Sequence, residues 1–80
     1  MKSRKASIKR DTKETSIQVS VNIDGNGKTN IKTGINFLDH LIVSFGKHGM
    51  MDLKVEAKSN DGIEHHVIED TAITIGQSID

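Results

Sequence analysis

The chain has 80 residues, of which 34% are hydrophobic, with two phenylalanines and no tryptophan, tyrosine or cysteine. A chain of this length forms one small domain that buries only about two-thirds of its unfolded surface, so a metal ion or oligomerisation often completes its core. Eleven basic and eleven acidic residues cancel, and the lack of cysteine excludes disulfides and thiolate zinc sites.

Residues 4–10 alternate loosely between apolar and polar side chains and predict a first strand. Basic residues are dense in this part of the chain, as in a nucleic-acid-binding arm. No aromatic side chain lies among them, so we favour lysines that protect an edge strand from aggregation and expect no nucleic-acid partner. The N-terminus lacks a signal-peptide core, and no run approaches the ~20 apolar residues of a membrane span. We therefore expect a cytoplasmic protein with no membrane partner.

Residues 15–23 (TSIQVSVNI) show the period-two pattern of a half-buried strand, with apolar and polar side chains on opposite faces. The DGNG string at 24–27 has the composition of a hairpin turn. Residues 28–34 are therefore expected to return as a third strand, antiparallel to the second.

From Ile35 to Phe45 the apolar residues take helical spacing, and Gly46 and Gly49 mark the end of this helix. Residues 51–59 return to the alternation of a strand.

Residues 60–62 (NDG) predict a turn, and a second helix follows from about Ile63. Its expected apolar stripe consists of Val67, Ile68, Ala72, Ile75 and Ile79. Many of these residues are β-branched, so packing must hold the helix. The order β-β-β-α-β-α predicts an α+β fold in which a four-stranded sheet is covered on one face by two helices.

Two adjacent histidines, His65 and His66, open the second predicted helix, and Glu69 follows four and three residues later. Neighbouring side chains on a helix point about 100° apart, so two ions, or one ion and one structural contact, suit the pair better than one shared ion. Imidazole with carboxylate suits manganese, iron or zinc, and Asp70 could accept the second N–H of a ligating histidine. The alternative is a polar helix start whose acidic residues favour the N-terminal dipole.

Three further residues are candidates. His40 lies in an apolar stripe of the first predicted helix, where a lone histidine is more often a core residue than a ligand. Combined with the HHxxED string, it would place three histidines and a carboxylate on two helices over one sheet. His48 is explained by the helix C-terminal dipole. Glu14 precedes the second strand, where acids are usually solvated.

Five strings occur in a specific order: R-x-T-x-E-T, D-G-x-G, T-G-I-x-F-L-D-H, H-G and H-H-x-x-E-D. Together they resemble the N-terminal half of the imidazoleglycerol-phosphate dehydratase family. The resemblance implies that residues 1–80 form a single half-domain, one of two similar β-β-β-α-β-α halves in a large homo-oligomer. It also implies dinuclear Mn²⁺ sites at subunit contacts, although other divalent metals would fit. The implied metal ligands are His40, His65, His66 and Glu69.

The implied reaction is the elimination of water from imidazole glycerol phosphate, a phosphorylated imidazole substrate, in histidine biosynthesis. The resemblance places Glu14 near the substrate as a general acid or base, while metal bound to the imidazole nitrogens would stabilise the developing charge. The family's second half and the basic and serine residues that bind the substrate phosphate are absent, although Lys and Arg of the first strand could substitute. Ser44 stands where the family usually has glutamine. We therefore expect activity to need self-association or a second half. The alternatives are an inactive, oligomeric metal-binding module and a non-catalytic interaction domain.

Overall fold

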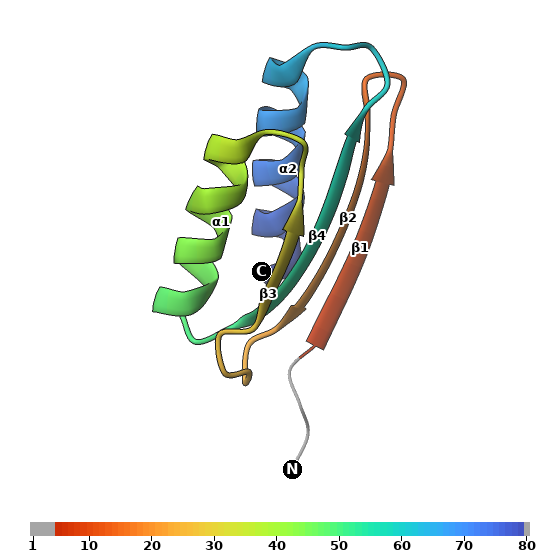
Figure 1. The fold of residues 1–80 in the computed structure, drawn as a ribbon. Coiled ribbons are helices and arrows are strands. Elements are labelled where there is room, and N and C mark those ends of the chain that lie inside the picture. The colour runs from red at the N-terminus through yellow and green to blue at the C-terminus, as the bar shows by residue number, and fades with distance from the viewer. Residues whose placement is uncertain (1–4, 80) are drawn as a thin grey trace.

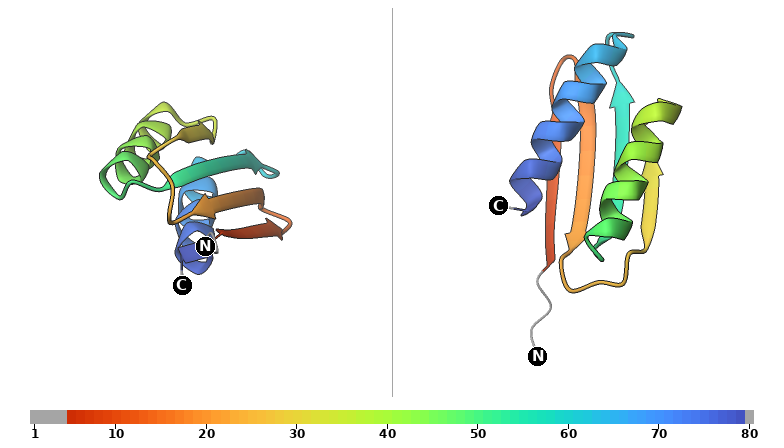
Figure 2. Two further views of the ribbon diagram at one scale, coloured as in Figure 1. Left: turned by 90° about the horizontal axis from the view of Figure 1, so that it is seen from below. Right: turned by 90° about the vertical axis from the view of Figure 1, so that its left-hand side faces the viewer.

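The computed structural model describes residues 5–79 and has the predicted element order. Arg4, which begins the predicted first strand, lies outside the described residues. The elements are β1 (Lys5–Asp11), β2 (Thr15–Asn22), β3 (Thr29–Lys32), α1 (Asn36–His48), β4 (Asp52–Ser59) and α2 (Glu64–Ile79). Both helices cover the same face of the four-stranded sheet, which confirms the predicted α+β class (Figures 1 and 2). No helix among residues 5–79 is long and apolar enough to cross a membrane.

The predicted hairpin between the second and third strands is wrong. The strand order is β1-β2-β4-β3, so β4 lies between β2 and β3. It pairs antiparallel with β2 and parallel with β3. The physical reason is the connection through α1, because a helical crossover is how two adjacent parallel strands are joined. β3 still runs opposite to β2, as predicted, but across an intervening strand.

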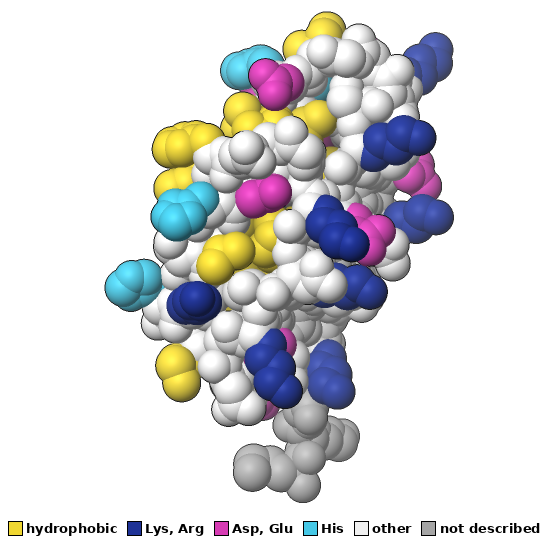
Figure 3. Space-filling view, in the orientation of Figure 1, with side chains coloured by type: hydrophobic (Ala, Val, Ile, Leu, Met, Phe, Trp, Pro, Cys, Tyr) yellow, Lys and Arg dark blue, Asp and Glu magenta, His cyan; other side chains and the backbone are white. Residues whose placement is uncertain are grey.

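The core lies between the sheet and the helices. The apolar positions of β2 and β4 alternate inward and meet directly, with Val19 opposite Val55 and Val21 opposite Leu53. All four side chains are buried. The other face of the sheet is polar, and basic side chains gather on that side of the molecule (Figure 3).

The buried face of α2 differs from its predicted apolar stripe. The buried residues of α2 are Val67, Thr71, Thr74 and Ser78, whereas Ile68 is 40% exposed. Small residues fit here because α2 packs mainly on β2, and a short side chain lets the helix lie close to the strand. Thr74 and Ser78 each donate a 2.7 Å hydrogen bond to a carbonyl of their own helix. Ile68, Ile73 and Ile79 are consequently left exposed, while Val67 and Ile75 of the predicted stripe pack against the core.

Candidate metal-binding site

The turn that carries Glu14 is joined to the loop before α2. Thr12 Oγ1 accepts hydrogen bonds from the backbone N–H groups of Glu14 and Thr15, at 3.1 and 3.0 Å. The backbone N–H of Asn60 donates to the carbonyl of Glu14 at 2.8 Å, and its side-chain amide donates to the carbonyl of Thr12 at 3.1 Å. These bonds hold Glu14 beside the start of α2, about fifty residues later in the chain.

His66 meets two carboxylates at this junction. Its Nδ1 lies 2.6 Å from Asp61 Oδ2 and 3.3 Å from Glu14 Oε2. The potential ligand atoms of Glu14, Asp61 and His66 all lie within 4.8 Å of one another. Within residues 5–79, this is the one group of three or more such side chains close enough to share an ion. The tertiary structure thus places Glu14 beside one of the paired histidines.

The charge of protonated His66 and the negative charges of Asp61 and Glu14 stabilise one another at this junction. The hydrogen bond to Asp61 raises the pKa of His66 above its usual value of 6.5, and the negative charge of Glu14 acts in the same direction. The pKa of Asp61 is lowered, first by the backbone N–H of Ile63 and then by His66. A divalent cation that binds His66 must therefore compete with a proton.

The other adjacent histidine has a different partner. His65 Nε2 contacts Glu69 Oε1 one helical turn away, and both side chains are largely exposed. The two histidine rings have centroids 6.5 Å apart and planes tilted by 49°. His65 and His66 therefore face separate groups, in agreement with the angle of about 100° between neighbours on a helix. Each ring therefore has a carboxylate partner of its own.

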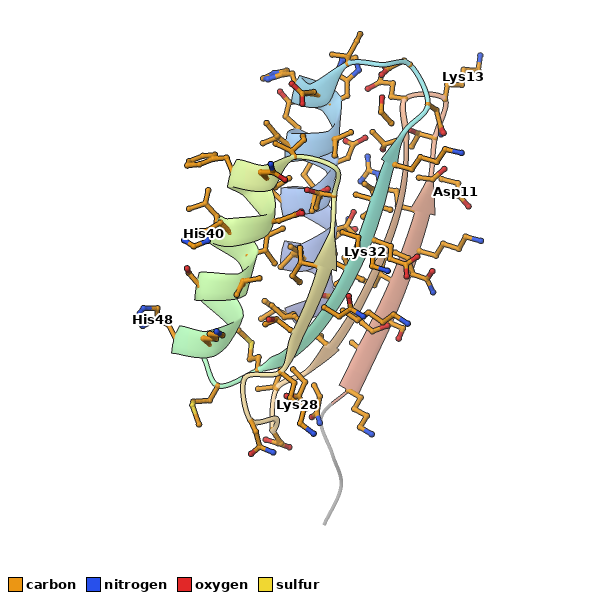
Figure 4. The ribbon with its side chains drawn as sticks, viewed as in Figure 1. Asp11, Lys13, Lys28, Lys32, His40 and His48 are labelled. Atoms are coloured by element: carbon orange, nitrogen blue, oxygen red, sulfur yellow. The ribbon has the colours of Figure 1, made fainter. Side chains whose placement is uncertain are left out.

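His40 lies apart from this group. It is exposed on α1 and, like His48, projects from the helix away from the sheet (Figure 4). The alternative that His40 is a core residue is therefore excluded, and its role as a metal ligand stays a prediction. It is not in the Glu14, Asp61 and His66 group, so any role as a ligand must come from contact with another surface.

Asp70 contacts the sheet. Its Oδ2 accepts a 2.6 Å hydrogen bond from the hydroxyl of Thr15, a fully buried residue at the start of β2. The predicted role of Asp70 was to hold a ligating histidine. In the structure its Oδ2 joins α2 to the strand that directly follows Glu14, and so fixes the helix relative to that residue. The histidine-positioning role stays a prediction.

Asp61 is the residue that the sequence did not single out. It lies in the NDG string, where it was interpreted only as part of a turn. The available signal was its position, since an aspartate before a glycine can fold its side chain back onto the following backbone. Its contact with His66, five residues later, depends on the conformation of the loop.

The donor set fits a borderline divalent cation. Among residues 5–79 the site offers imidazole nitrogen and carboxylate oxygen, and the chain contains no thiolate. Such mixed nitrogen and oxygen donors suit manganese, iron or zinc. The chemistry of the residues is therefore compatible with the manganese that the resemblance implies.

Comparisons with known proteins point to one family. The family model described as imidazoleglycerol-phosphate dehydratase matches residues 33–80. Curated imidazoleglycerol-phosphate dehydratases from Phenylobacterium zucineum and Acetivibrio thermocellus are each 51% identical to the chain, over 78 and 77 residues. The one from Methanococcoides burtonii is 53% identical over 77 residues. These alignments cover 95–96% of this chain but 40% of each relative, so the chain spans about two-fifths of their length.

Proposed function

The chain belongs to the imidazoleglycerol-phosphate dehydratase family, and we propose that it supplies one half-domain of a lyase that eliminates water from imidazole glycerol phosphate. The main support is the identity of 51–53% along nearly the whole chain. This biosynthetic role also favours a cytoplasmic location. Because the chain covers 40% of each relative, we propose that activity needs a second half-domain.

We propose that Mn²⁺ binds to His65, His66 and Glu69, with His40 contributed from a neighbouring chain. The adjacent histidines would serve two different ions, because their rings face separate partners. When bound, manganese supplies Lewis-acid stabilisation of the charge that develops on the substrate imidazole. The exposure of His65 and Glu69 leaves this pair accessible to a ligand.

Glu14 is the residue that we propose to move a proton. Its carboxylate is about half exposed and lies 3.3 Å from His66 Nδ1. Glu14 is therefore an acid that both a substrate and solvent can reach. At that position Glu14 could remove the proton from the substrate carbon or protonate the leaving hydroxyl.

The helical face offers a surface for self-association. Phe37, Leu41 and Phe45 of α1 are exposed by 48–72%, and hydrophobic side chains are visible along this edge (Figure 3). An apolar groove of about 260 Å³ lies between α1 and α2. Thr71 is one of its lining residues, and the hydroxyl of Thr71 is buried without a hydrogen-bond partner. We propose that a second copy of the chain covers this face. His40 projects from the same helix and would then approach the site of the neighbouring copy.

The test is light scattering of chelator-stripped protein before and after the addition of Mn²⁺, with bound metal counted per chain. We expect the mass to rise as about one or more ions bind to each chain. His65→Ala and Glu69→Ala should weaken both effects, whereas His48→Ala, which removes another exposed histidine, should leave them unchanged. A dehydration assay on the assembled protein would follow. No metal uptake and no change in mass would refute the metal-linked assembly.

A further inference from the structure

The loop between β4 and α2, residues 59–63, holds the carboxylate of Asp61 in one orientation. Asp61 Oδ1 accepts hydrogen bonds from the backbone N–H of Ile63 at 2.9 Å and from the hydroxyl of Ser59 at 3.2 Å. The same hydroxyl accepts a 2.7 Å bond from the N–H of Gly62, whose φ of 77° suits glycine. With Oδ1 engaged in this way, Oδ2 points at His66.

The contact between Asp61 and His66 determines which ring nitrogen carries the proton. An ionised carboxylate can only accept hydrogen bonds, and a neutral imidazole has one N–H and one free lone pair. Because Oδ2 lies 2.6 Å from Nδ1, Nδ1 must be the donor. The lone pair is then on Nε2, at the far side of the ring.

We infer that Asp61 is a positioning residue, which holds His66 in the Nδ1–H tautomer and thereby presents Nε2 to a divalent cation. Histidine ligands commonly donate their second N–H to a carboxylate, and this bond sets both tautomer and ring orientation. The identity of the ligand at Nε2 rests on the proposed function. The tautomer is a property of the metal-free chain.

Asp61 is better placed for this role than Glu14. The distances to Nδ1 are 2.6 Å for Asp61 and 3.3 Å for Glu14. The Asp61 side chain is also less exposed, at 24% against 53%, and its second oxygen is fixed by the loop. The two carboxylates thus have separate tasks: Asp61 orients the ring, and Glu14 remains free to exchange a proton.

Asp61→Asn is the most informative variant. The asparagine oxygen can replace Oδ1 and keep the bond from Ile63, so its NH₂ group takes the place of Oδ2 and donates to Nδ1. His66 is then driven to the Nε2–H tautomer, which has no lone pair for a cation on that side. We expect Mn²⁺ affinity to fall about 10–100-fold, the range seen when the partner of a metal-binding histidine is changed. Ser59→Ala is the matched control, because it loosens the loop and leaves the carboxylate facing His66.

The experiment measures the histidine tautomers of the metal-free chain by ¹⁵N NMR, at a pH where His66 is neutral, and Mn²⁺ affinity by calorimetry. Zn²⁺ replaces Mn²⁺ for the NMR of the loaded chain, because it is diamagnetic. We expect Nδ1–H in the unaltered chain and in Ser59→Ala, Nε2–H in Asp61→Asn, and a zinc-induced shift at Nε2.

An Nε2–H tautomer in the unaltered chain, or zinc bound at Nδ1, would overturn the inference. It would also be overturned if a folded Asp61→Asn kept the Nδ1–H tautomer. If that variant did not fold, the tautomer of the unaltered chain and of Ser59→Ala would decide the question. An Nδ1–H tautomer in a chain that takes up neither metal would support the role of Asp61 and refute the proposed metal site.

Discussion

The hydrogen bond between Thr15 and Asp70 should make a large contribution to stability. Thr15 is fully buried, and its hydroxyl donates to the Asp70 carboxylate at 2.6 Å. A hydrogen bond to a charged group contributes about 1.5–3 kcal/mol. Asp70→Ala leaves a buried hydroxyl without an acceptor, so we expect it to lower the free energy of unfolding by about 1–3 kcal/mol. A loss of about 2 kcal/mol would lower the melting temperature of so small a domain by about 8–16 °C.

A double-mutant cycle isolates this bond. Thr15→Val removes the hydroxyl and keeps the shape of the side chain, and we expect it to cost less because water can still reach the half-buried Asp70. The double variant should lose less stability than the sum of the two single variants, by about 1.5–3 kcal/mol. The assay is urea unfolding followed by circular dichroism, with chelator present and the protein concentration held fixed.

Ser78→Ala serves as the control for this cycle. It also removes a buried hydroxyl from α2, but one that bonds to a carbonyl of its own helix, so we expect a small effect. Strictly additive losses would refute the proposed coupling of Thr15 and Asp70. If Asp70→Ala kept the stability and changed only metal affinity, Asp70 would have the histidine-positioning role that the sequence suggested.

Three further predictions concern two glycines and the pH dependence of stability. Gly76→Ala should raise the free energy of unfolding by about 0.5–1 kcal/mol, because the added methyl group meets nothing within 4 Å and the helix loses an interior glycine. Gly46→Ala should lower the free energy of unfolding by about 1–3 kcal/mol, since its Cβ would lie 2.8 Å from Thr29 Cγ2. Urea unfolding measures both glycine variants, and equal effects of the two would refute the packing argument. Hydrogen bonds from backbone N–H groups of the loop before β3 lower the pKa of Asp52 below its usual value of 3.8. The ionised carboxylate therefore stabilises the fold above pH 3.8. This stabilisation is lost as the pH falls through the lowered pKa. Asp52→Asn should therefore be less stable than the unaltered chain at neutral pH, with a difference that shrinks in acid; a difference independent of pH would contradict this assignment.

Sequence patterns did not predict the order of the strands in the sheet. The alternation in residues 15–23 correctly indicated which side of β2 is buried, but it carries no information about which strand lies beside it. The DGNG string favoured a hairpin, whereas the crossover through α1 places β4 next to β2. A period of two reports burial of one face, while strand neighbours depend on how the connections pack.

The buried side of α2 was also decided by tertiary packing. Hydropathy favoured residues such as Ile68, yet the positions that face the sheet include Thr71 and Thr74. The hydrophobicity of a residue alone does not predict which side of a helix faces the sheet. Close approach to β2 selects small side chains, and Ile68, Ile73 and Ile79 remain exposed.

The sequence by itself determined the kinds of element, their order and the family, because periodicity and the order of the motifs are local properties of the chain. It also indicated that the adjacent histidines would face different partners, since that angle follows from helix geometry alone. Only the tertiary structure brought Glu14 to His66 and aimed Asp61 at the same ring. The position of Glu14 depends on a hydrogen bond between two loops that are distant in sequence, which forms only when the sheet has assembled. The carboxylate of Asp61 is oriented by bonds within its own loop.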